Sequence, residues 1–380
     1  MSDFGIYVHW PFCAAKCPYC DFNSHVRAKI EEESWVDGIL RELEHVAAWQ
    51  SDGRPIVETI FFGGGTPSLM SGKAVGAVID KIARLWRMAN DVEVTLESNP
   101  ASVEAQRFAD YRAAGVNRVS LGVQALNDKD LKMLGRLHDV AEAKAALALA
   151  MKNFERVSLD LIYARPDQTE TEWRKELKEA LAFGTEHLSL YQLTIEPATP
   201  FATLARTGAL KPMDDDRAAA LYEITQEMTE AAGRPAYEIS NHARPGAESR
   251  HNLLYWRYGS YAGVGPGAHG RLDINGARIA TVTEKLPERW RQNVSRIGHG
   301  IVEESRIAND EAAREHLLMN LRLSEGIDLA AYRARWNKEP RVRRIAELSQ
   351  DGFLRVENDR LFATPKGRLV LNRLIAEIAD

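Results

Sequence analysis

Long hydrophobic runs, a basic leader and an excess of positive charge are all missing from this 380-residue sequence. No apolar stretch approaches the roughly twenty residues of a membrane-spanning helix. Residues 1–5 contain no basic region followed by an apolar one, so we expect no signal peptide. Lysine and arginine number 49 against 54 acidic residues, and this net charge of −5 indicates no nucleic-acid partner. The composition predicts an ordinary soluble protein, long enough for two domains.

Cysteine is scarce: the chain has three, all within eight positions, at Cys13, Cys17 and Cys20. Thiolates are soft ligands, so three on one short loop favour a soft metal or an iron–sulfur cluster. A 4Fe–4S cluster takes four protein thiolates, so one iron here would lack one. In catalytic metal sites, such an open position is where a small molecule binds. Clustered free thiols without an export signal also predict a reducing cytoplasm.

Three other interpretations of the cysteines carry less weight. A loop that contains Lys16 and Pro18 is a poor segment for a buried core. A zinc site would need a fourth ligand, for which the candidates are His9, Asp21 and His25, and its cysteine spacing would be unusual. A disulfide framework is typical of small secreted chains with an even number of cysteines, and neither condition holds.

Strands and helices are predicted to alternate six times from the N-terminus to about residue 231. The expected strands cover 5–10, 57–62, 91–97, 116–123, 156–163 and 187–195. The expected helices cover 31–49, 72–88, 101–113, 128–134 with 139–152, 170–183 and 214–231. Strict alternation indicates right-handed βαβ units and a parallel sheet. A closed barrel needs eight units, so six favour a partial (β/α)6 barrel, with an open doubly wound sheet as the alternative.

The chain is expected to divide into three parts. Residues 1–235 form the partial barrel with the cysteine loop near its start, and 236–282 form a connecting segment rich in Gly, His and aromatic residues. A loop is expected over 243–270 within that segment. Residues 283–380 form a small helical domain with a β-hairpin wing that turns at Asn358–Asp359. This resembles a winged helix, but the charge balance does not favour DNA binding.

Unusual residues follow the ends of successive predicted strands: the cysteine loop, the Gly63–Gly65 turn, Glu97, Gln124 and Asp160. The carboxyl ends of parallel strands in an α/β barrel meet at one mouth, so these groups should lie together. Glycine lets the backbone approach a ligand, and carboxylates accept ribose hydroxyls or pair with an ammonium group. An arginine at 136 suits a carboxylate. Together they predict a pocket for a zwitterion attached to a nucleoside.

A histidine followed by aromatic residues stands at His251–Trp256, in the sequence HNLLYW. A histidine beside flat rings could ligate haem iron, with the rings packed on the porphyrin. On the residues alone, a structural histidine anchored by packed aromatics is favoured. His242 and His269 are weaker haem-ligand candidates.

Six motifs resemble the HemW family of radical S-adenosylmethionine (SAM) proteins, which is related to oxygen-independent coproporphyrinogen III dehydrogenase. They are YVHWPFC at 7–13, CPYCDFNS at 17–24, GGGTPS at 63–68, ESNP at 97–100, VSLGVQ at 119–124 and HNLLYW at 251–256. The resemblance implies a 4Fe–4S cluster on the three cysteines and haem at His251. It implies SAM contacts from Tyr7, Tyr19, Gly64, Gly65, Thr66, Glu97, Gln124, Arg136 and Asp160.

Two features distinguish the sequence from the dehydrogenase. The dehydrogenase has a further cysteine two residues after the third, where this chain has Phe22, and an extension ahead of the cluster, which here begins at residue 13. The resemblance therefore implies a haem chaperone that passes haem to an acceptor protein. An electron donor such as a flavodoxin or ferredoxin would serve the cluster. The alternative is radical decarboxylation of the propionate side chains of coproporphyrinogen III.

Overall fold

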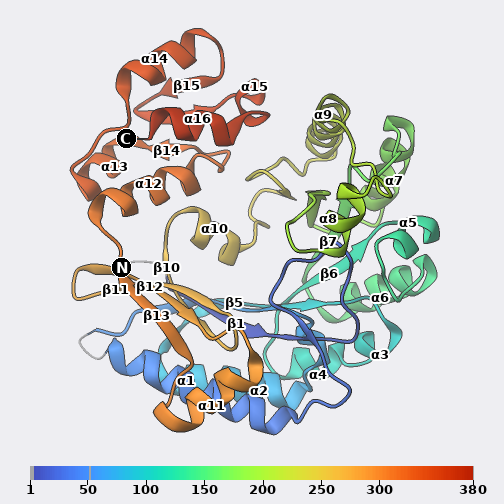
Figure 1. Cartoon of the computed structure of the whole chain (residues 1–380), viewed down its shortest axis with the longest axis vertical. Coiled ribbons are helices and arrows are strands. Elements are labelled where there is room, and N and C mark those ends of the chain that lie inside the picture. The colour runs from blue at the N-terminus through green and yellow to red at the C-terminus, as the bar shows by residue number, and fades with distance from the viewer. Residues whose placement is uncertain (1–3, 51–52, 380) are drawn as a thin grey trace.

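The computed structural model describes residues 4–50 and 53–379. Its centre is a sheet of eleven strands, above which the C-terminal unit stands at the upper left of Figure 1. The strand order is β13 (Ile301–Arg306), β12 (Ala277–Thr283), β11 (His269–Ile274), β10 (Ser260–Val264), β1 (Phe4–Trp10), β4 (Ile56–Gly64), β5 (Arg87–Ser98), β6 (Arg118–Gln124), β7 (Arg156–Tyr163), β8 (His187–Gln192) and β9 (Asn241–Ala243).

The six strands expected from the sequence are present and pair in parallel, which confirms the α/β fold and its partial barrel. Strand β10 adds a seventh parallel strand beside β1, while β11–β13 and β9 are antiparallel. The strands are nearly continuous apolar runs because helices cover one face and the barrel interior the other. No pairing closes the sheet from β9 to β13 within the described residues.

The helices between the parallel strands lie close to their expected places. One of the expected helices, over 101–113, is interrupted at Gln106–Arg107 into α3 and α4. The helices of this part are α1 (Glu32–Trp49), α2 (Gly72–Leu85), α3 (Ser102–Ala105), α4 (Phe108–Ala113), α5 (Asp128–Met133), α6 (Val140–Asn153), α7 (Glu170–Ala182), α8 (Pro200–Arg206) and α9 (Asp215–Ala231), with a 3-10 turn η1 (Pro67–Leu69).

The loop expected over 243–270 is wrong at the level of secondary structure. It contains helix α10 (Arg250–Trp256) and strand β10, and it leads into β11. Strand β10, which contains Gly263 and is flanked by Gly259 and Gly265, was missed because its stability depends on partners distant in the chain. At Gly263 an added Cβ would lie 2.0 Å from the His269 carbonyl oxygen, so glycine is required by close strand approach. Helix α11 (Pro287–Ile297) then packs on α1. The division of the chain at 235 and 282 stays a prediction.

The C-terminal unit has its own hydrophobic core, built from side chains between Ile307 and Ile378 with Tyr258 added from outside. It contains α12 (Asn309–Asn320), β14 (Ile327–Asp328), α13 (Leu329–Trp336), α14 (Val342–Gln350), β15 (Leu354–Glu357), β16 (Arg360–Ala363), α15 (Pro365–Arg368) and α16 (Leu371–Ile378). The predicted hairpin is present, and its turn residues Asn358 and Asp359 have φ of 50° and 61°. Those values suit the tight turns that match strand twist.

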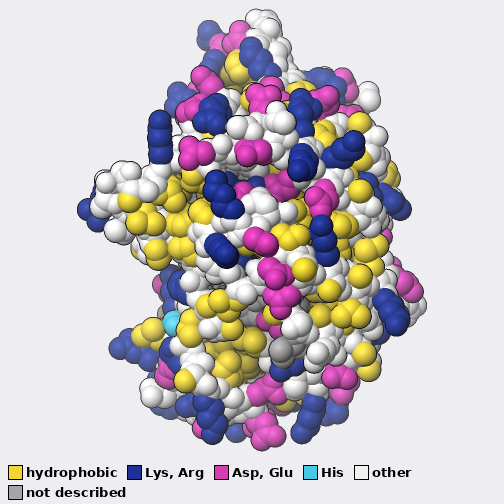
Figure 2. Space-filling view, turned by 90° about the vertical axis from the view of Figure 1, so that its right-hand side faces the viewer, with side chains coloured by type: hydrophobic (Ala, Val, Ile, Leu, Met, Phe, Trp, Pro, Cys, Tyr) yellow, Lys and Arg dark blue, Asp and Glu magenta, His cyan; other side chains and the backbone are white. Residues whose placement is uncertain are grey.

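The molecular surface carries charges of both signs. Figure 2 shows Lys and Arg interspersed with Asp and Glu over one face, with small groups of hydrophobic side chains between them. That face therefore presents no broad basic area of the kind that nucleic-acid binding requires. Among the described residues, no helix is both long enough and apolar enough to span a membrane.

Candidate functional site

The cysteine loop follows β1 and is fixed to distant parts of the fold. Cys13 ends the short strand β2 (Phe12–Cys13), which pairs with β3 (His25–Val26). Asn23 anchors the loop: its amide donates to the carbonyls of Pro266 and Lys285, each at 2.9 Å. Its own carbonyl lies 2.9 Å from His9 Nε2. The loop is therefore held at one end of the barrel before any ligand is considered.

The Gly63–Gly65 turn lies directly against this loop. The Gly65 N–H donates to the Trp10 carbonyl at 2.7 Å, and the Thr66 N–H donates to the Phe12 carbonyl at 2.8 Å. Gly64 has φ of 107°, and an added Cβ would lie 2.6 Å from the His9 ring. Glycine is needed here because no side chain fits between the end of β4 and His9 of β1.

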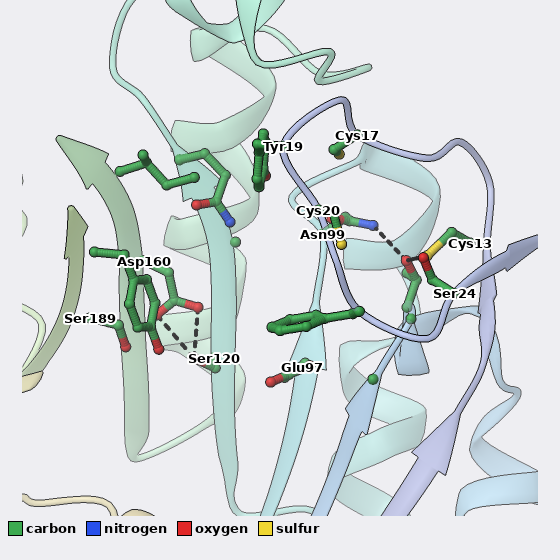
Figure 3. A pocket seen from close by; sticks show the side chains of 18 of the residues that line it. Cys13, Cys17, Tyr19, Cys20, Ser24, Glu97, Asn99, Ser120, Asp160 and Ser189 are labelled. Atoms are coloured by element: carbon green, nitrogen blue, oxygen red, sulfur yellow. Dashed lines mark hydrogen bonds between the residues drawn. The ribbon is translucent and has the colours of Figure 1, made fainter. Parts of the chain in front are cut away.

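A cavity of about 450 Å³ opens at the carboxyl ends of the parallel strands. Figure 3 shows the cysteines on one side, Asp160, Ser120 and Ser189 on the other, and Glu97 between them. The sequence-predicted residues that line it are Cys13, Cys17, Tyr19, Cys20, Gly64, Gly65, Thr66, Glu97, Gln124, Arg136 and Asp160. Parallel topology thus brings together groups that are widely separated along the chain.

The thiols of the loop are free and half-buried. Burial raises the pKa of Cys13 and of Cys20, so without a metal both are protonated at neutral pH. Thr66 Oγ1 donates to Cys13 Sγ at 3.3 Å, and the Arg136 guanidinium donates to Cys17 Sγ at 3.5 Å. Such donors favour thiolates, and a coordinated metal would complete the deprotonation. Three thiols that line one cavity, two of them facing these donors, have the ligand chemistry of an iron–sulfur cluster.

Two of the carboxyl groups that line the cavity, Glu97 and Asp160, have raised pKa values. Burial, and then the charge of Asp160, raises the pKa of Glu97 to about 8, against the opposing hydrogen bond from the Gly64 N–H. Burial also raises the pKa of Asp160, although Ser120 and Ser158 donate to its oxygens at 2.8–3.0 Å. At neutral pH this pair of carboxyl groups therefore retains a proton, which a cationic ligand would displace.

Arg136 and Gln124 complete the rim. The Arg136 guanidinium donates to the Asn99 side chain, and at 2.9 Å to the Gly122 carbonyl. Gln124 has φ of 73°, in the left-handed region, where the register between β6 and β7 shifts. Strain of this kind at a bulge redirects a side chain and is concentrated at ligand sites.

Comparison with known proteins agrees with this geometry. The model of the Radical SAM superfamily matches residues 7–180, and the HemN C-terminal domain matches 307–370. Heme chaperone HemW of Escherichia coli is 38% identical over 99% of this chain and 98% of its own length. The chain belongs to the HemW family of radical SAM proteins. A further relative, mitochondrial radical S-adenosyl methionine domain-containing protein 1 of Bos taurus, is 37% identical over 98% of this chain and 86% of its own length.

A solved structure also resembles this HemW-family chain. Coproporphyrinogen III oxidase (HemN) of Escherichia coli superposes with a TM-score of 0.83 over 100% of this chain and 90% of its own, at 22% identity. At that identity the likeness establishes the fold, from the barrel through the C-terminal unit.

Two predicted site residues do not line the cavity. Tyr7 stacks on Phe61, with ring centroids 6.3 Å apart, and it is Phe61 that lines the cavity. His251 is 1% exposed, with Nδ1 2.7 Å from Thr59 Oγ1 and Nε2 2.8 Å from the Tyr255 hydroxyl. Both ring nitrogens of this HemW-family motif therefore have partners inside the protein.

The residue after His251 does reach the cavity. Asn252 lines it, and its amide donates to the Tyr237 hydroxyl at 3.3 Å. That hydroxyl lies 2.9 Å from His187 Nε2, and His187 Nδ1 lies 2.8 Å from Ser158 Oγ, which donates to Asp160. A buried polar chain thus connects helix α10 with the Asp160 carboxylate.

Sequence reasoning missed several residues that line the cavity. They are Arg118, Ser120, Gly122, Ser189, Tyr191 and Asn252, together with others from the loops. The first three could have been predicted. They precede Gln124 by six, four and two positions, and every second side chain of a strand points to the same face of the sheet. Asn252 gave no such signal, since the placement of α10 depends on tertiary packing.

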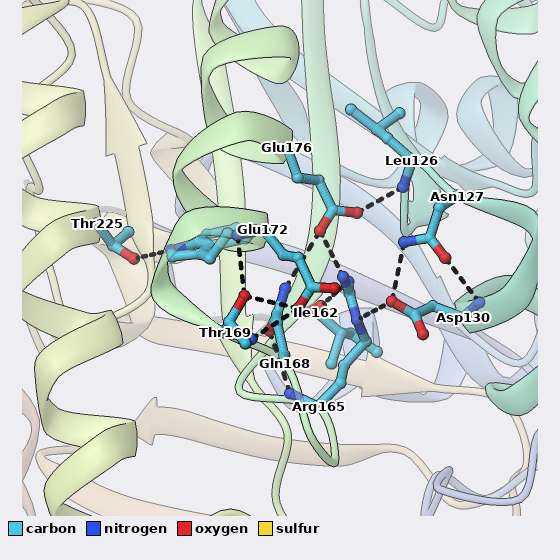
Figure 4. Close-up of polar contacts among 11 residues, drawn as sticks. Leu126, Asn127, Asp130, Ile162, Arg165, Gln168, Thr169, Glu172, Glu176 and Thr225 are labelled. Carbon is cyan, nitrogen blue, oxygen red and sulfur yellow. Dashed lines mark hydrogen bonds and ion pairs between the residues drawn. The ribbon is translucent and has the colours of Figure 1, made fainter.

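The strand ends behind the cavity are locked by the buried polar cluster of Figure 4. Arg165, 1% exposed, pairs with Glu176 of α7 and, at 2.9 Å, with Asp130 of α5. Glu176 also accepts from the Leu126 N–H at 2.6 Å. These contacts join the loops that follow β6 and β7, so Gln124 and Asp160 are positioned on a rigid rim.

Proposed function

We propose that this protein is a haem chaperone: it binds haem and passes it to an acceptor protein. The observation that carries the proposal is identity with heme chaperone HemW of Escherichia coli across nearly the full length of both chains. HemW of Mycobacterium tuberculosis supports it, at 37% identity over 98% of this chain. Both alignments extend beyond the barrel into the C-terminal unit.

We further propose that Cys13, Cys17 and Cys20 hold a 4Fe–4S cluster. Their free thiols line one cavity, and hydroxyl and guanidinium donors face two of the sulfurs, which supports this set. Such a cluster, when bound, can supply an electron to SAM at its open iron. Iron analysis tests the assignment: about four irons per chain are expected, and stoichiometric zinc would overturn it.

The rim residues are proposed to bind SAM in an exchangeable way. Glu97 would pair with the ammonium group, while Asp160 and Gln124 would accept ribose hydroxyls. Arg136 supplies positive charge near the carboxylate, and the glycine turn lets the backbone approach. The full proposed set is Tyr7, Tyr19, Gly64, Gly65, Thr66, Glu97, Gln124, Arg136 and Asp160. Tyr7 would act through Phe61, on which it stacks and which lines the cavity.

His251 remains the proposed haem ligand, on the strength of its motif. Ligation requires one ring nitrogen to lose its partner, either Thr59 or Tyr255. Tyr255→Phe removes the hydroxyl at Nε2 and leaves the ring in place. If Nε2 binds iron, this variant should bind haem at least as tightly as the wild type, because no internal hydrogen bond is broken.

The test is an anaerobic haem titration of the protein reconstituted with iron and sulfide, followed by Soret absorbance. The chaperone proposal expects saturable binding by the wild type and by Tyr255→Phe, and weaker binding with an altered Soret band for His251→Ala. Absence of saturable binding in the wild type overturns the chaperone. If His251→Ala retains wild-type affinity and spectrum, the ligand assignment alone fails.

Coproporphyrinogen III decarboxylation is the competing proposal, and the fold shared with HemN favours considering it. Phe22, where the dehydrogenase has a cysteine, lines the cavity and is 59% exposed. The protein is incubated anaerobically with reductant, SAM and coproporphyrinogen III. Catalytic formation of protoporphyrinogen would replace the chaperone proposal with the enzyme.

The protein's partners and compartment are proposed by chemical class. We propose an acceptor protein that receives haem and a low-potential electron donor such as a flavodoxin or ferredoxin. Three free thiols support a reducing compartment, and the cytoplasm is the proposal that suits them.

A further inference from the structure

Arg118 is a buried cation for which the described part of the chain provides no hydrogen-bond or ion-pair partner. It begins β6, is 2% exposed and lines the inner part of the cavity. No hydrogen bond or ion pair of its guanidinium exists among the described residues, and its Nε is inaccessible to solvent. A guanidinium offers five N–H donors in a planar fork, so leaving it unpaired in the interior is costly.

The position of Arg118 separates it from the cysteine loop. It shares the inward face of β6 with Ser120 and Gly122, and it precedes Gln124 by six residues. Their Cα atoms are therefore about 20 Å apart along the strand. The cavity thus has two ends: an outer one at the cysteines and an inner one at Arg118.

A second unpaired polar group lies beside it. Thr95 is the register neighbour of Arg118 on β5, and its buried Oγ1 has no hydrogen-bond partner within residues 4–50 and 53–379. Asn252 adds an amide to the cavity lining from α10. Two unpaired buried polar side chains at one register position of β5 and β6, next to the cavity, indicate that an acceptor is missing from between them.

The neighbouring carboxylates do not fill this role. Asp160 influences Arg118 through its charge but accepts hydrogen bonds from Ser120 and Ser158. Glu93 caps helix α10 by accepting from the N–H groups of Arg250 and His251, each at 3.2 Å. Their oxygens are therefore engaged elsewhere.

We propose that the inner end of the cavity is a carboxylate-binding subsite in which Arg118 grips the anion and the Thr95 hydroxyl and Asn252 amide assist. A planar carboxylate matches the guanidinium fork with two parallel hydrogen bonds. Two sources carry this chemistry: a free small carboxylate, or a propionate of haem. The second source rests on the proposed chaperone function.

Acetate is the probe for the subsite itself. Sodium acetate is titrated into the reconstituted protein at constant ionic strength against sodium chloride, and the melting temperature and calorimetric affinity are measured. Saturable stabilisation by acetate beyond chloride is expected for the wild type and for Arg343→Met, whose arginine is 95% exposed. Arg118→Met should lose this response, and Arg118→Lys should bind about ten-fold more weakly because the fork is lost.

The same variants separate a ligand site from a structural role. Arg118→Met removes an unpaired buried charge, so its melting temperature without acetate should equal or exceed that of the wild type. A fall of many degrees in Arg118→Met, with Arg118→Lys showing wild-type acetate binding, would overturn the subsite. So would a wild type that responds equally to acetate and chloride.

Haem and its dimethyl ester distinguish the two sources. If a propionate occupies the subsite, Arg118→Met should weaken haem binding about ten- to hundred-fold and leave binding of the dimethyl ester unchanged. If the occupant is a free carboxylate, haem binding should not change while the acetate response is lost. Failure of the wild type to bind haem would remove the chaperone proposal, and the acetate titration would still decide the subsite.

Discussion

Substituting Gly65 by alanine tests how the glycine turn supports the cysteine loop. The added Cβ would lie 2.7 Å from the Phe12 carbonyl oxygen and 2.9 Å from the Phe12 nitrogen. Both atoms belong to the backbone, so no side chain can rotate away. Relief requires β4 and the loop to separate, which weakens the hydrogen bonds from Gly65 and Thr66 to the loop.

The size of the effect follows from these contacts. Overpacking against backbone costs about 1–3 kcal/mol, and weakening two backbone hydrogen bonds adds about 1 kcal/mol each. The strain falls on the segment that leads into Cys13. We therefore expect a melting temperature lowered by several degrees, and incomplete reconstitution, with iron well below the roughly four atoms per chain of a 4Fe–4S cluster.

The matched control is Gly76→Ala. Gly76 lies within helix α2, where an added Cβ would meet Ala114 at an ordinary 3.6 Å. This variant should be more stable by about 0.5–1 kcal/mol and should reconstitute fully. The assays are thermal unfolding and iron analysis after anaerobic reconstitution. Wild-type stability and full iron content in Gly65→Ala would refute the reasoning.

Three further changes have defined outcomes. With a pKa of about 8 when folded, Glu97 keeps a proton that the unfolded chain loses near pH 4.5, so wild-type stability should fall as the pH rises between those values. Glu97→Gln should remove this fall in the free energy of unfolding, which approaches about 1.4 kcal/mol per pH unit between the two pKa values. The control is Glu155→Gln, at an exposed site, which should keep the wild-type pH profile. The same pH profile in both variants would contradict the prediction. Glu42→Ala leaves the buried N–H groups of Gly265, Gly300 and the Trp290 ring without their acceptor, and each loss should lower the free energy of unfolding by about 1–3 kcal/mol. The control Glu33→Ala, at an exposed position of the same helix, should melt near the wild-type temperature. Equal melting of these two variants would be the contrary result. Asn23→Ala frees the cysteine loop from two carbonyls and should speed iron loss to a chelator; an unchanged rate would exclude the anchor.

Much of the fold could be predicted because its signals are local. Alternating apolar strands and amphipathic helices identify βαβ units, and parallel topology then brings the strand ends to one mouth. Glu97, Gln124 and Asp160 were found in this way, and they line the cavity with the three cysteines. The hairpin turn at Asn358–Asp359 was equally local, since those residue types tolerate positive φ.

Strands β11 and β12 form a local hairpin with Asn275–Gly276 at its turn, a signal that sequence reasoning missed. Strand β10, by contrast, depends on a partner far along the chain. Strand β10 pairs with β1, which lies near the N-terminus. Until that partner is known, Gly263 and the flanking Gly259 and Gly265 are typical of a loop. Helix α10 was not predicted from helix propensity either. Its first turn is capped by Glu93 of β5, a residue far away in the sequence.

The sequence by itself determined the chemistry available to this protein. The spacing of three thiols and the residues at the ends of six strands are local sequence signals. Because the strands are parallel, their carboxyl ends lie at one edge of the sheet, which brings these residues together. Tertiary structure alone decided how each group is partnered. It buried His251 between Thr59 and Tyr255 and left Arg118 without an acceptor among the described residues, because partnering depends on which distant segments pack together.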